Sequence, residues 1–196
     1  KDREEANEIK ELVAYCKEYL AYLKIFAERK KIGKSDAKRS VELAAYGTHC
    51  LLQPPHLVLA LMVAMTQAYK LKNFITAASF ARRLLEVNEQ FASSKSSKSM
   101  SSAAKKAEKV LKLSERQGRN SVKIEYEEQD SFVLCCETMT PIYKGNKKTR
   151  CPYCFAHYLP KYSGKVCKIC GVAQIGLETL GLVSFSSSRR GYSKVC

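Results

Sequence analysis

Four cysteines near the C-terminal end of the chain have the spacing of metal ligands. Cys151 and Cys154 form one C-x-x-C unit, Cys167 and Cys170 form a second, and twelve residues separate them. A C-x-x-C turn directs both sulfur atoms the same way, so two such turns supply the four thiolates of a tetrahedral zinc site. The spacer is slightly shorter than the roughly 15–20 residues usual between such pairs. The pattern predicts one structural zinc ion per chain, with no open coordination position for catalysis.

Two other chemistries remain open for these cysteines. The sequence Cys151-Pro-Tyr-Cys154 is also that of a redox dithiol, which needs a helix N-terminus within a βαβ unit. Pro160 and Gly164 follow too soon for such a helix, and a second C-x-x-C unit would be left unexplained. Four free thiols are the other alternative. A fully paired disulfide set is excluded because the chain has nine cysteines, an odd number.

No catalytic or cofactor-binding residues are predicted elsewhere. His49 and His56 flank the Pro54-Pro55 pair without a neighbouring nucleophile. His157 lies beside the first cysteine pair, and because four cysteines already complete a site we expect it to be a surface residue. Glycine-rich phosphate loops and metalloprotease motifs are absent from the sequence. We therefore expect a protein that is not an enzyme and has no small-molecule substrate.

The first 118 residues predict a stack of helices that resembles part of an α-solenoid. Apolar residues recur at three- and four-residue steps, beginning with a long segment at 3–31. The expected boundaries are Gly33 after the first helix, Ser35 or Asp36 as the cap of the second, Pro54 and Pro55 in the first turn of the third, and Asn73 as the cap of the fourth.

The pattern changes in the second half of the chain. Residues 93–102, SSKSSKSMSS, predict a low-complexity linker, followed by a short basic helix that Ser102 caps and Gly118 closes. Alternating apolar residues and glycine-rich turns predict a small β-rich half at 121–186, and 187–196 is expected to be a flexible tail. The predicted class is α+β, with a helical half at 1–118 followed by a zinc-ribbon-like half.

The chain is strongly basic, with a formal net charge of +15. Eight lysines and arginines stand against two acidic residues in 93–120, and eleven against six in 121–196. Such an excess is typical of a solvated linker or of a protein that binds nucleic acid. Apolar residues make up 45% of the chain, enough for a core, and no apolar run reaches the roughly 18 residues of a membrane span.

Three stretches together resemble the C-terminal domain of the alpha subunit of coatomer. They are YKLKNFITAASFARRLLEV, IEYEEQDSFVLCCETMTPIYKGNKKTRCPYC and CKICGVAQIGLETLGL. The resemblance extends from about Glu8 to about Val183, and the Ser/Lys tract at 93–102 and the basic tail after 186 depart from it. The chain opens with KDREEANE, as if inside a helix, and we expect it to be a piece of a longer protein.

The resemblance implies a non-catalytic scaffold domain of the COPI vesicle coat. It implies docking of the epsilon subunit, a tetratricopeptide-type helical protein that in this family is expected to curl around a protruding β-hairpin. Other coatomer subunits are the remaining partners, and membrane association is indirect, through the coat. The implied location is cytoplasmic, peripheral on Golgi membranes and coated vesicles, in Golgi-to-ER and intra-Golgi transport. The alternative is a nucleic-acid-binding zinc ribbon on a helical support, which the burial expected of the helices disfavours.

Two hairpins are candidates for the docking element. The first joins 122–127 to 131–136, and the second joins 172–175 to 180–185. The second is preferred because its turn is more apolar and bent by glycine, and because its leucines would form an aggregation-prone edge if nothing covered them. The predicted partner-binding residues are Leu177, Leu180 and Leu182 in the second hairpin and Ile124, Tyr126 and Phe132 in the first.

Overall fold

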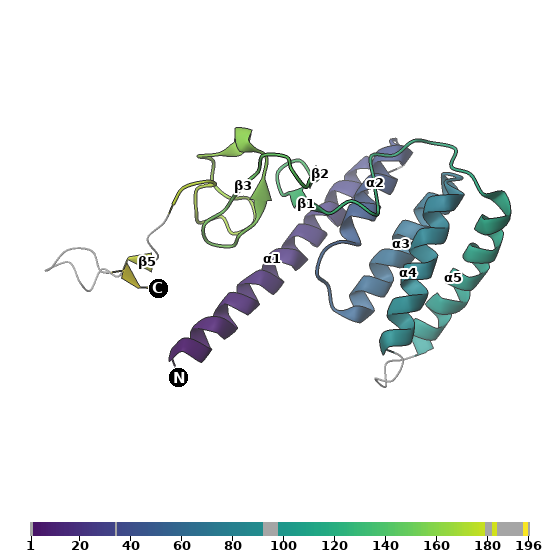
Figure 1. Cartoon of the computed structure of the whole chain (residues 1–196), viewed down its shortest axis with the longest axis horizontal. Helices are drawn as coiled ribbons and strands as arrows, with labels where there is room; N and C mark the ends of the chain where they lie inside the picture. Colours follow the sequence, from purple (N-terminus) through teal and green to yellow (C-terminus); the bar gives the residue numbers. More distant parts are fainter. Residues whose placement is uncertain (1, 34, 92–97, 179–181, 184–193, 196) are drawn as a thin grey trace, which may run out of the picture. The chain divides into compact units, whose positions relative to one another are not determined.

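The chain folds into two compact units, residues 1–131 and 132–196. The computed structural model describes residues 2–33, 35–91, 98–178, 182–183 and 194–195. The first unit contains five helices, and the second contains short two-stranded sheets and loops (Figure 1). The predicted α+β class, with the helices first and the β structure second, is confirmed.

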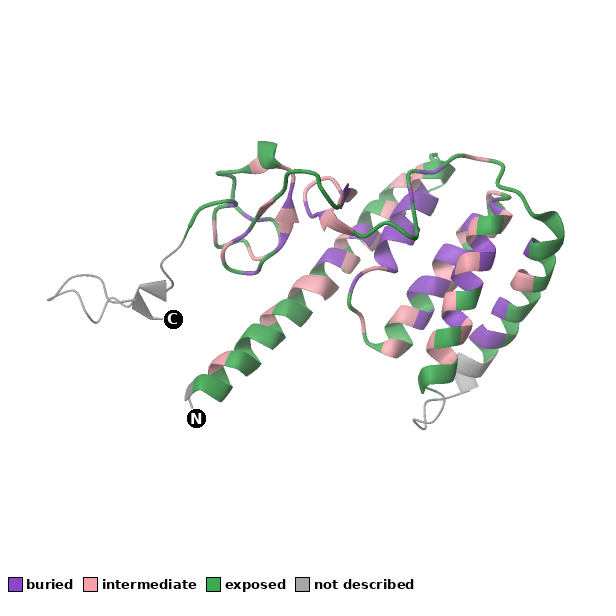
Figure 2. Ribbon diagram, viewed as in Figure 1, coloured by how far each residue is buried: buried purple, intermediate pink, exposed green. Residues whose placement is uncertain are grey.

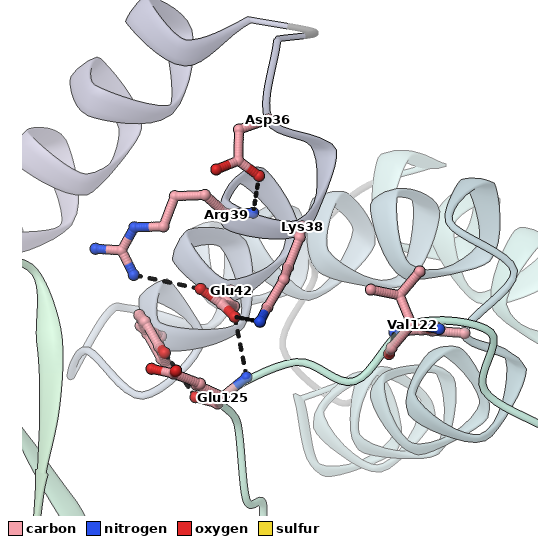
Figure 3. Close-up of polar contacts among 8 residues, drawn as sticks. Asp36, Lys38, Arg39, Glu42, Val122 and Glu125 are labelled. Atoms are coloured by element: carbon pink, nitrogen blue, oxygen red, sulfur yellow. Dashed lines mark hydrogen bonds and ion pairs between the residues drawn. The ribbon is translucent and has the colours of Figure 1, made fainter.

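The first two helices begin and end where the sequence predicts. Helix α1 spans Asp2–Ile32 and ends at Gly33, whose φ of 58° is one that glycine adopts easily. Helix α2 spans Ala37–Gly47 and is capped by Asp36, whose carboxylate accepts a hydrogen bond from the Arg39 amide at 2.8 Å (Figure 3).

The next three helices pack side by side (Figure 1). Helix α3 spans Pro54–Lys70, α4 spans Phe74–Phe91 and α5 spans Lys98–Gln117. Because α5 begins at Lys98, the last part of the predicted linker is helical and Ser102 is not its cap, while 92–97 lies outside the described residues. Buried residues line the helices of this unit (Figure 2). The core is mainly apolar, and its largest fully buried side chains include Ile25, Leu43, Tyr46, Leu61, Met65, Phe80 and Leu84.

A segment of extended chain, residues 119–128, runs along the helices, and we call it the strap. At its start the Asn73 side chain, which is fully buried, donates to the Val122 carbonyl and accepts from the Val122 amide, both at 2.9 Å. The Asn120 side-chain oxygen accepts from the amides of Ile75 and Thr76 at 3.0 and 3.3 Å. Asn120 of the strap therefore caps α4, and the prediction that the Asn73 side chain does so was wrong.

The second part of the strap is fastened to α2. Glu42, only 4% exposed, accepts a hydrogen bond from the Glu125 amide at 3.0 Å (Figure 3). The Tyr46 hydroxyl donates to the Glu125 carbonyl at 2.6 Å. Lys38 and Arg39 lie 3.8 and 3.5 Å from the Glu42 carboxylate and balance its charge. A buried carboxylate is tolerated here because it is both paired and hydrogen-bonded.

Two strap side chains enter the helical core. Ile124 and Tyr126 are 9% and 8% exposed, and the Tyr126 ring lies 5.5 Å from that of Phe80. Burial raises the pKa of Tyr126 to about 12, so its hydroxyl stays protonated at neutral pH. Residues 121–131, predicted as the start of the β half, thus belong to the helical unit.

The contact between Tyr126 and His49 predicts acid sensitivity of the helical unit. The His49 Nε2 atom lies 2.9 Å from the Tyr126 hydroxyl, and burial, with a smaller contribution from the Arg83 charge, lowers the pKa of His49 to about 4. An unfolded histidine titrates near pH 6.5, so between about pH 6.5 and 4 only the unfolded chain takes up the proton. Stability is therefore complete above pH 6.5 and is lost as the pH falls through this window.

We expect the free energy of unfolding to drop by about 1–3 kcal/mol across the window, less than the full linkage value because His49 is half-buried. Urea unfolding followed by circular dichroism between pH 7 and 5 measures it. His49→Gln keeps a polar partner for Tyr126 and should flatten the dependence over that range. An equally steep dependence in this variant would assign the effect to other groups.

The second unit is built from short antiparallel pairs. Strand β1 (Phe132–Cys135) pairs with β2 (Thr140–Tyr143), and β3 (Thr149–Arg150) pairs with β4 (His157–Tyr158). A 3-10 turn, η1 (Pro160–Tyr162), follows β4.

The first predicted hairpin was wrong, and the second lies largely outside the described residues. Residues 131–136 do not pair with 122–127, because 122–127 lies on the helices and β1 pairs instead with β2. Residues 172–175 pair back onto 164–167, through a bridge of Val166 with Gln174, and of the predicted partner segment 180–185 only 182–183 are described. Strand β5 (Leu182–Val183), in the predicted β-rich half, pairs with β6 (Lys194–Val195), which lies within the region predicted as a flexible tail. The rest of 179–193 lies outside the described residues.

In the described part of the chain, none of the helices combines the length and apolar character required to cross a bilayer.

Candidate metal centre

The first cysteine pair lies in the turn between β3 and β4. The Cys151 amide donates to the Ala156 carbonyl at 2.9 Å, and the Phe155 amide donates back to the Cys151 carbonyl at 3.1 Å. Phe155, the residue after Cys154, has a φ of 59°, in the left-handed region. This tight turn brings both sulfurs to the inner side of the loop, where Cys151 and Cys154 are 0% and 3% exposed.

The second pair repeats this geometry. The Cys167 amide donates to the Ala173 carbonyl, and the Gly171 amide donates to the Cys167 carbonyl, both at 2.8 Å. Gly171 stands where Phe155 stands in the first turn and has a φ of 69°. Glycine adopts this conformation without the steric penalty that a side chain incurs, so the second turn carries less backbone strain than the first.

The two turns bring all four sulfurs together. The Sγ atoms of the four cysteines lie within 4.8 Å of one another. The Cys151 and Cys170 sulfurs are 3.7 Å apart, and the Cys154 and Cys167 sulfurs are 3.6 Å apart. Four sulfurs about 2.3 Å from a central zinc, at tetrahedral angles, are separated by about 3.8 Å. The donor set and its spacing therefore fit a tetrahedral metal ion such as zinc.

These distances weigh against the other cysteine chemistries. A disulfide requires a sulfur separation of about 2.05 Å, far below the shortest distances here. Both short contacts also join one C-x-x-C unit to the other, whereas a redox dithiol acts within one unit. The first pair is followed by β4 and η1 and not by a helix that would activate a thiol.

A buried tyrosine supports the centre from one side. The hydroxyl of Tyr158, which is fully buried, lies 3.0 Å from the Cys167 sulfur and accepts a hydrogen bond from the Lys168 amide at 3.1 Å. Burial acts to raise the pKa of Cys167, but hydrogen bonds to its sulfur together outweigh burial and leave that pKa at about 7; the largest of these contributions comes from Tyr158. Tyr158 thus stabilises a thiolate, the form that binds metal.

The other cysteines of the cluster favour a cation in a different way. Burial raises the pKa of the Cys151 and Cys154 thiols above the usual range. Thiolates in such surroundings need a compensating positive charge, which a bound metal ion supplies. Tyr158 could not be identified from the sequence, because it lies nine residues before Cys167 and belongs to no recognisable motif with it.

The six predicted partner-binding residues do not form one surface among the described residues. Ile124 and Tyr126 are buried in the helical unit, and Phe132 packs on Tyr143 with ring centroids 5.7 Å apart. Leu177 is 50% exposed and lines an open groove in the second unit. The side chains of Leu180 and Leu182 lie outside the described residues.

The groove itself was not predicted. It is lined by Lys148, Thr149, Arg150, Pro152, Phe155, His157, Gly176, Leu177 and Glu178. The Arg150 guanidinium lies over the Phe155 ring at 5.4 Å. A signal for Phe155 was present in the sequence, since a bulky apolar residue stands where the second cysteine turn has a glycine.

The fold and the site define an α+β protein in which a helical unit is followed by a small β unit with four clustered cysteines. Among known families, residues 1–190 match the one that comprises the C-terminus of the alpha subunit of coatomer (COPI). The chain belongs to this family, a COPI coat component, and it is therefore a coat-protein domain and not an enzyme.

Individual relatives are similar over almost the whole chain. The chain is 42% identical over 188 residues to "Coatomer subunit alpha-1" of Arabidopsis thaliana, covering 96% of this chain and 15% of the relative. It is 40% identical to "Coatomer subunit alpha" of Dictyostelium discoideum and 28% identical to that of Saccharomyces cerevisiae, each covering 92% of this chain. The chain thus spans about 15% of the length of these relatives.

Proposed function

We propose that this chain is a docking domain of the COPI coat that binds the epsilon subunit through its cysteine-clasped β unit. One structural zinc ion holds the four cysteines together and keeps the docking surface rigid. The domain supports Golgi-to-ER and intra-Golgi transport on the cytoplasmic face of Golgi membranes and coated vesicles. It reaches the membrane indirectly, through the other coatomer subunits.

The observation that carries the proposal is exposed apolar surface on a very small unit. Its exposed large apolar residues are Tyr153, Phe155, Val166, Val172 and Leu177, each between 45% and 74% exposed. Apolar residues gathered on a small module mark an interaction site more often than a solvated surface. Phe155 and Leu177 line the same groove, which makes them the central anchors of the proposed docking surface.

The positive rim of the groove fits a partner with acidic groups around an apolar contact. Lys148 and Arg150 line the same groove as Phe155 and Leu177, against one carboxylate, that of Glu178. Residues 132–196 carry ten lysines and arginines against two acidic residues. Complementary rim charges speed association, whereas the apolar anchors supply most of the affinity.

The same charge keeps nucleic acid as a second candidate partner. Lys161 and Lys165 both lie 5.3 Å from the Tyr162 ring, an interleaving of cations and an aromatic that resembles a single-strand binding surface. The half-buried Tyr162 is less available for base stacking than an exposed ring. Family membership favours the protein partner.

Co-purification with the epsilon subunit tests the docking surface. Leu177→Asp and Phe155→Asp should each weaken binding by at least about thirtyfold, since truncating a central anchor typically costs 2 kcal/mol or more. Aspartate tolerates the left-handed backbone at position 155, so the turn should survive. Zinc content near one ion per chain confirms that the β unit remains folded in each variant.

A matched control lies on the helical unit. Leu113 on α5 is 47% exposed, and Leu113→Asp should leave binding unchanged. Loss of binding in Leu113→Asp, with normal binding in Leu177→Asp, would place the docking surface on the helices and refute the proposal. A gel-shift assay with single-stranded RNA at 150 mM salt decides the second candidate, because RNA should not compete with the epsilon subunit.

A further inference from the structure

The helical unit contains a cavity of about 430 Å³ that the coat function does not use. It lies where the C-terminal ends of α1 and α3 meet the N-terminal end of α2. Its lining residues are Arg29, Lys30, Gly33, Ala37, Ser40, Val41, Gln67, Lys70 and Leu71. The volume is within the range of about 300–1,000 Å³ typical of small-molecule sites.

The charged lining of this cavity has one sign. Arg29, Lys30 and Lys70 contribute positive charge, and none of the described lining residues is acidic. Within the described part of the chain these three side chains form no ion pair with a carboxylate. The Arg29 and Lys30 charges lie 5.5 and 4.7 Å from the Phe26 ring, which orders them without neutralising them.

A largely buried serine, Ser40, also lines the cavity. Ser40 is only 6% exposed, and among the described residues its Oγ atom has no hydrogen-bond partner. Serine within a helix often turns its hydroxyl back to the carbonyl four residues earlier. Here the carbonyl of Asp36 is bonded to the Ser40 backbone amide at 3.0 Å but not to the hydroxyl. The Ser40 hydroxyl is therefore available to a ligand.

Cations at helix C-termini have a simpler explanation, because they balance the negative end of the helix dipole. That explanation suits Arg29, Lys30 and Lys70 as individual residues. Lys31, in the same turn, shows the ordinary outcome, since it pairs with Glu28 at 3.4 Å. Helix-end neutralisation explains neither the presence of three cationic residues in one cavity lining nor the Ser40 hydroxyl, for which no partner is found among the described residues.

We propose that this cavity binds a small molecule bearing a phosphate monoester. Three cations match a phosphate dianion better than a single carboxylate, and the Ser40 hydroxyl adds a donor that a phosphate oxygen accepts. The cavity is larger than one phosphate, and Val41 and Leu71 give it apolar walls, so the rest of the ligand is a compact polyol or lipid head group. The site lies in the helical unit and is independent of the docking surface.

Binding of inorganic pyrophosphate, measured by calorimetry at 150 mM salt, tests the site directly. The double variant Arg29→Gln/Lys70→Gln should bind at least about tenfold more weakly, because charge-assisted hydrogen bonds are lost. Ser40→Ala leaves the net charge unchanged and should weaken binding about threefold. Ala37→Trp fills the cavity from an exposed position, keeps the charge and should abolish binding.

Because the whole chain is basic, a charge-matched control is essential. Lys105→Gln/Lys109→Gln on the exposed face of α5 removes the same charge elsewhere and should change binding by less than about twofold. Equal weakening in this control, unchanged binding in Ala37→Trp, or no pyrophosphate binding by the wild type would overturn the proposal. Displacement of pyrophosphate by a hexaglutamate peptide at equal concentration would overturn it in favour of an acidic protein partner. Circular dichroism melting confirms that each variant is folded.

Vesicles distinguish a lipid head group from a soluble phosphate. Two vesicle preparations carry equal surface charge, one from phosphatidylinositol 4-phosphate and the other from phosphatidylserine. Binding to the first alone, lost in Ala37→Trp, supports a lipid ligand. Vesicle binding that is the same in the wild type and in Ala37→Trp, together with cavity-dependent pyrophosphate binding, supports a soluble ligand.

Discussion

Cys154→Ser is expected to release the metal and unfold residues 132–178 while leaving the helical unit intact. The four sulfurs are held by two turns whose surroundings contain few regular hydrogen bonds, since the described strands of this unit are only two to four residues long. Zinc binding contributes about 10–16 kcal/mol in small zinc peptides, and this free energy is folding free energy. So small a core cannot replace it.

Metal analysis and spectroscopy together measure this outcome. The wild type should carry about one zinc per chain, and Cys154→Ser well under half an equivalent. The helical circular dichroism should persist, while amide resonances of the β unit collapse to the random-coil range. Cys16→Ser is the matched control, because Cys16 is exposed on α1 and lies outside the cluster. A Cys154→Ser protein with a native β unit would show that the cysteines are ordinary core residues.

The parts of the fold that sequence predicts well are those determined by neighbouring residues. The end of α1 at Gly33, the cap at Asp36 and the start of α3 at Pro54 depend on contacts within one turn. The cysteine cluster was predictable for a similar reason. Each C-x-x-C turn is local, and the repetition of the turn in Cys167–Gly171 implies that the two halves meet.

The errors concern contacts between distant residues. The alternation of Val122, Ile124 and Tyr126 correctly indicates an extended segment with one buried face. It does not reveal whether that face covers a strand or a helix. Here the buried face meets helices through Asn73, 49 residues before Val122, and through Glu42, 83 residues before Glu125.

The fate of the cap at Asn73 shows why such contacts escape prediction. Asparagine before an apolar helix is a good N-cap candidate, and α4 does begin at the next residue. The structure instead uses the Asn73 amide to hold Val122 and lets Asn120 cap the helix. Asn120 of the strap thus accepts the hydrogen bonds of amides at the start of α4, while Asn73, just before α4, bonds the backbone of the strap. Only the tertiary structure reveals this exchange of partners.

The second large expected effect is on the stability of the helical unit, because Tyr126 of the strap packs against side chains from more than one helix. Tyr126→Ala should lower the free energy of unfolding of the helical unit by about 3–5 kcal/mol, the usual cost of removing a buried aromatic ring. The loss includes ring contacts with Phe80 and Tyr46, at 5.5 and 6.4 Å between centroids, and the hydrogen bond with His49. The chain contains no tryptophan, so urea unfolding is best followed by circular dichroism.

Two comparisons separate the ring from its hydroxyl and from partner binding. Tyr126→Phe keeps the ring and loses only the hydroxyl contact, so it should cost about 1 kcal/mol. If Tyr126 acts by packing on this chain's own helices, Tyr126→Ala should weaken epsilon binding only at temperatures where the helical unit begins to unfold. If Tyr126→Ala has normal stability but loses epsilon binding at 4 °C, Tyr126 does not act by packing on this chain's own helices. The strap would then be a partner-binding segment that rests on the helices, and the role of Tyr126 would pass from the core to the interface.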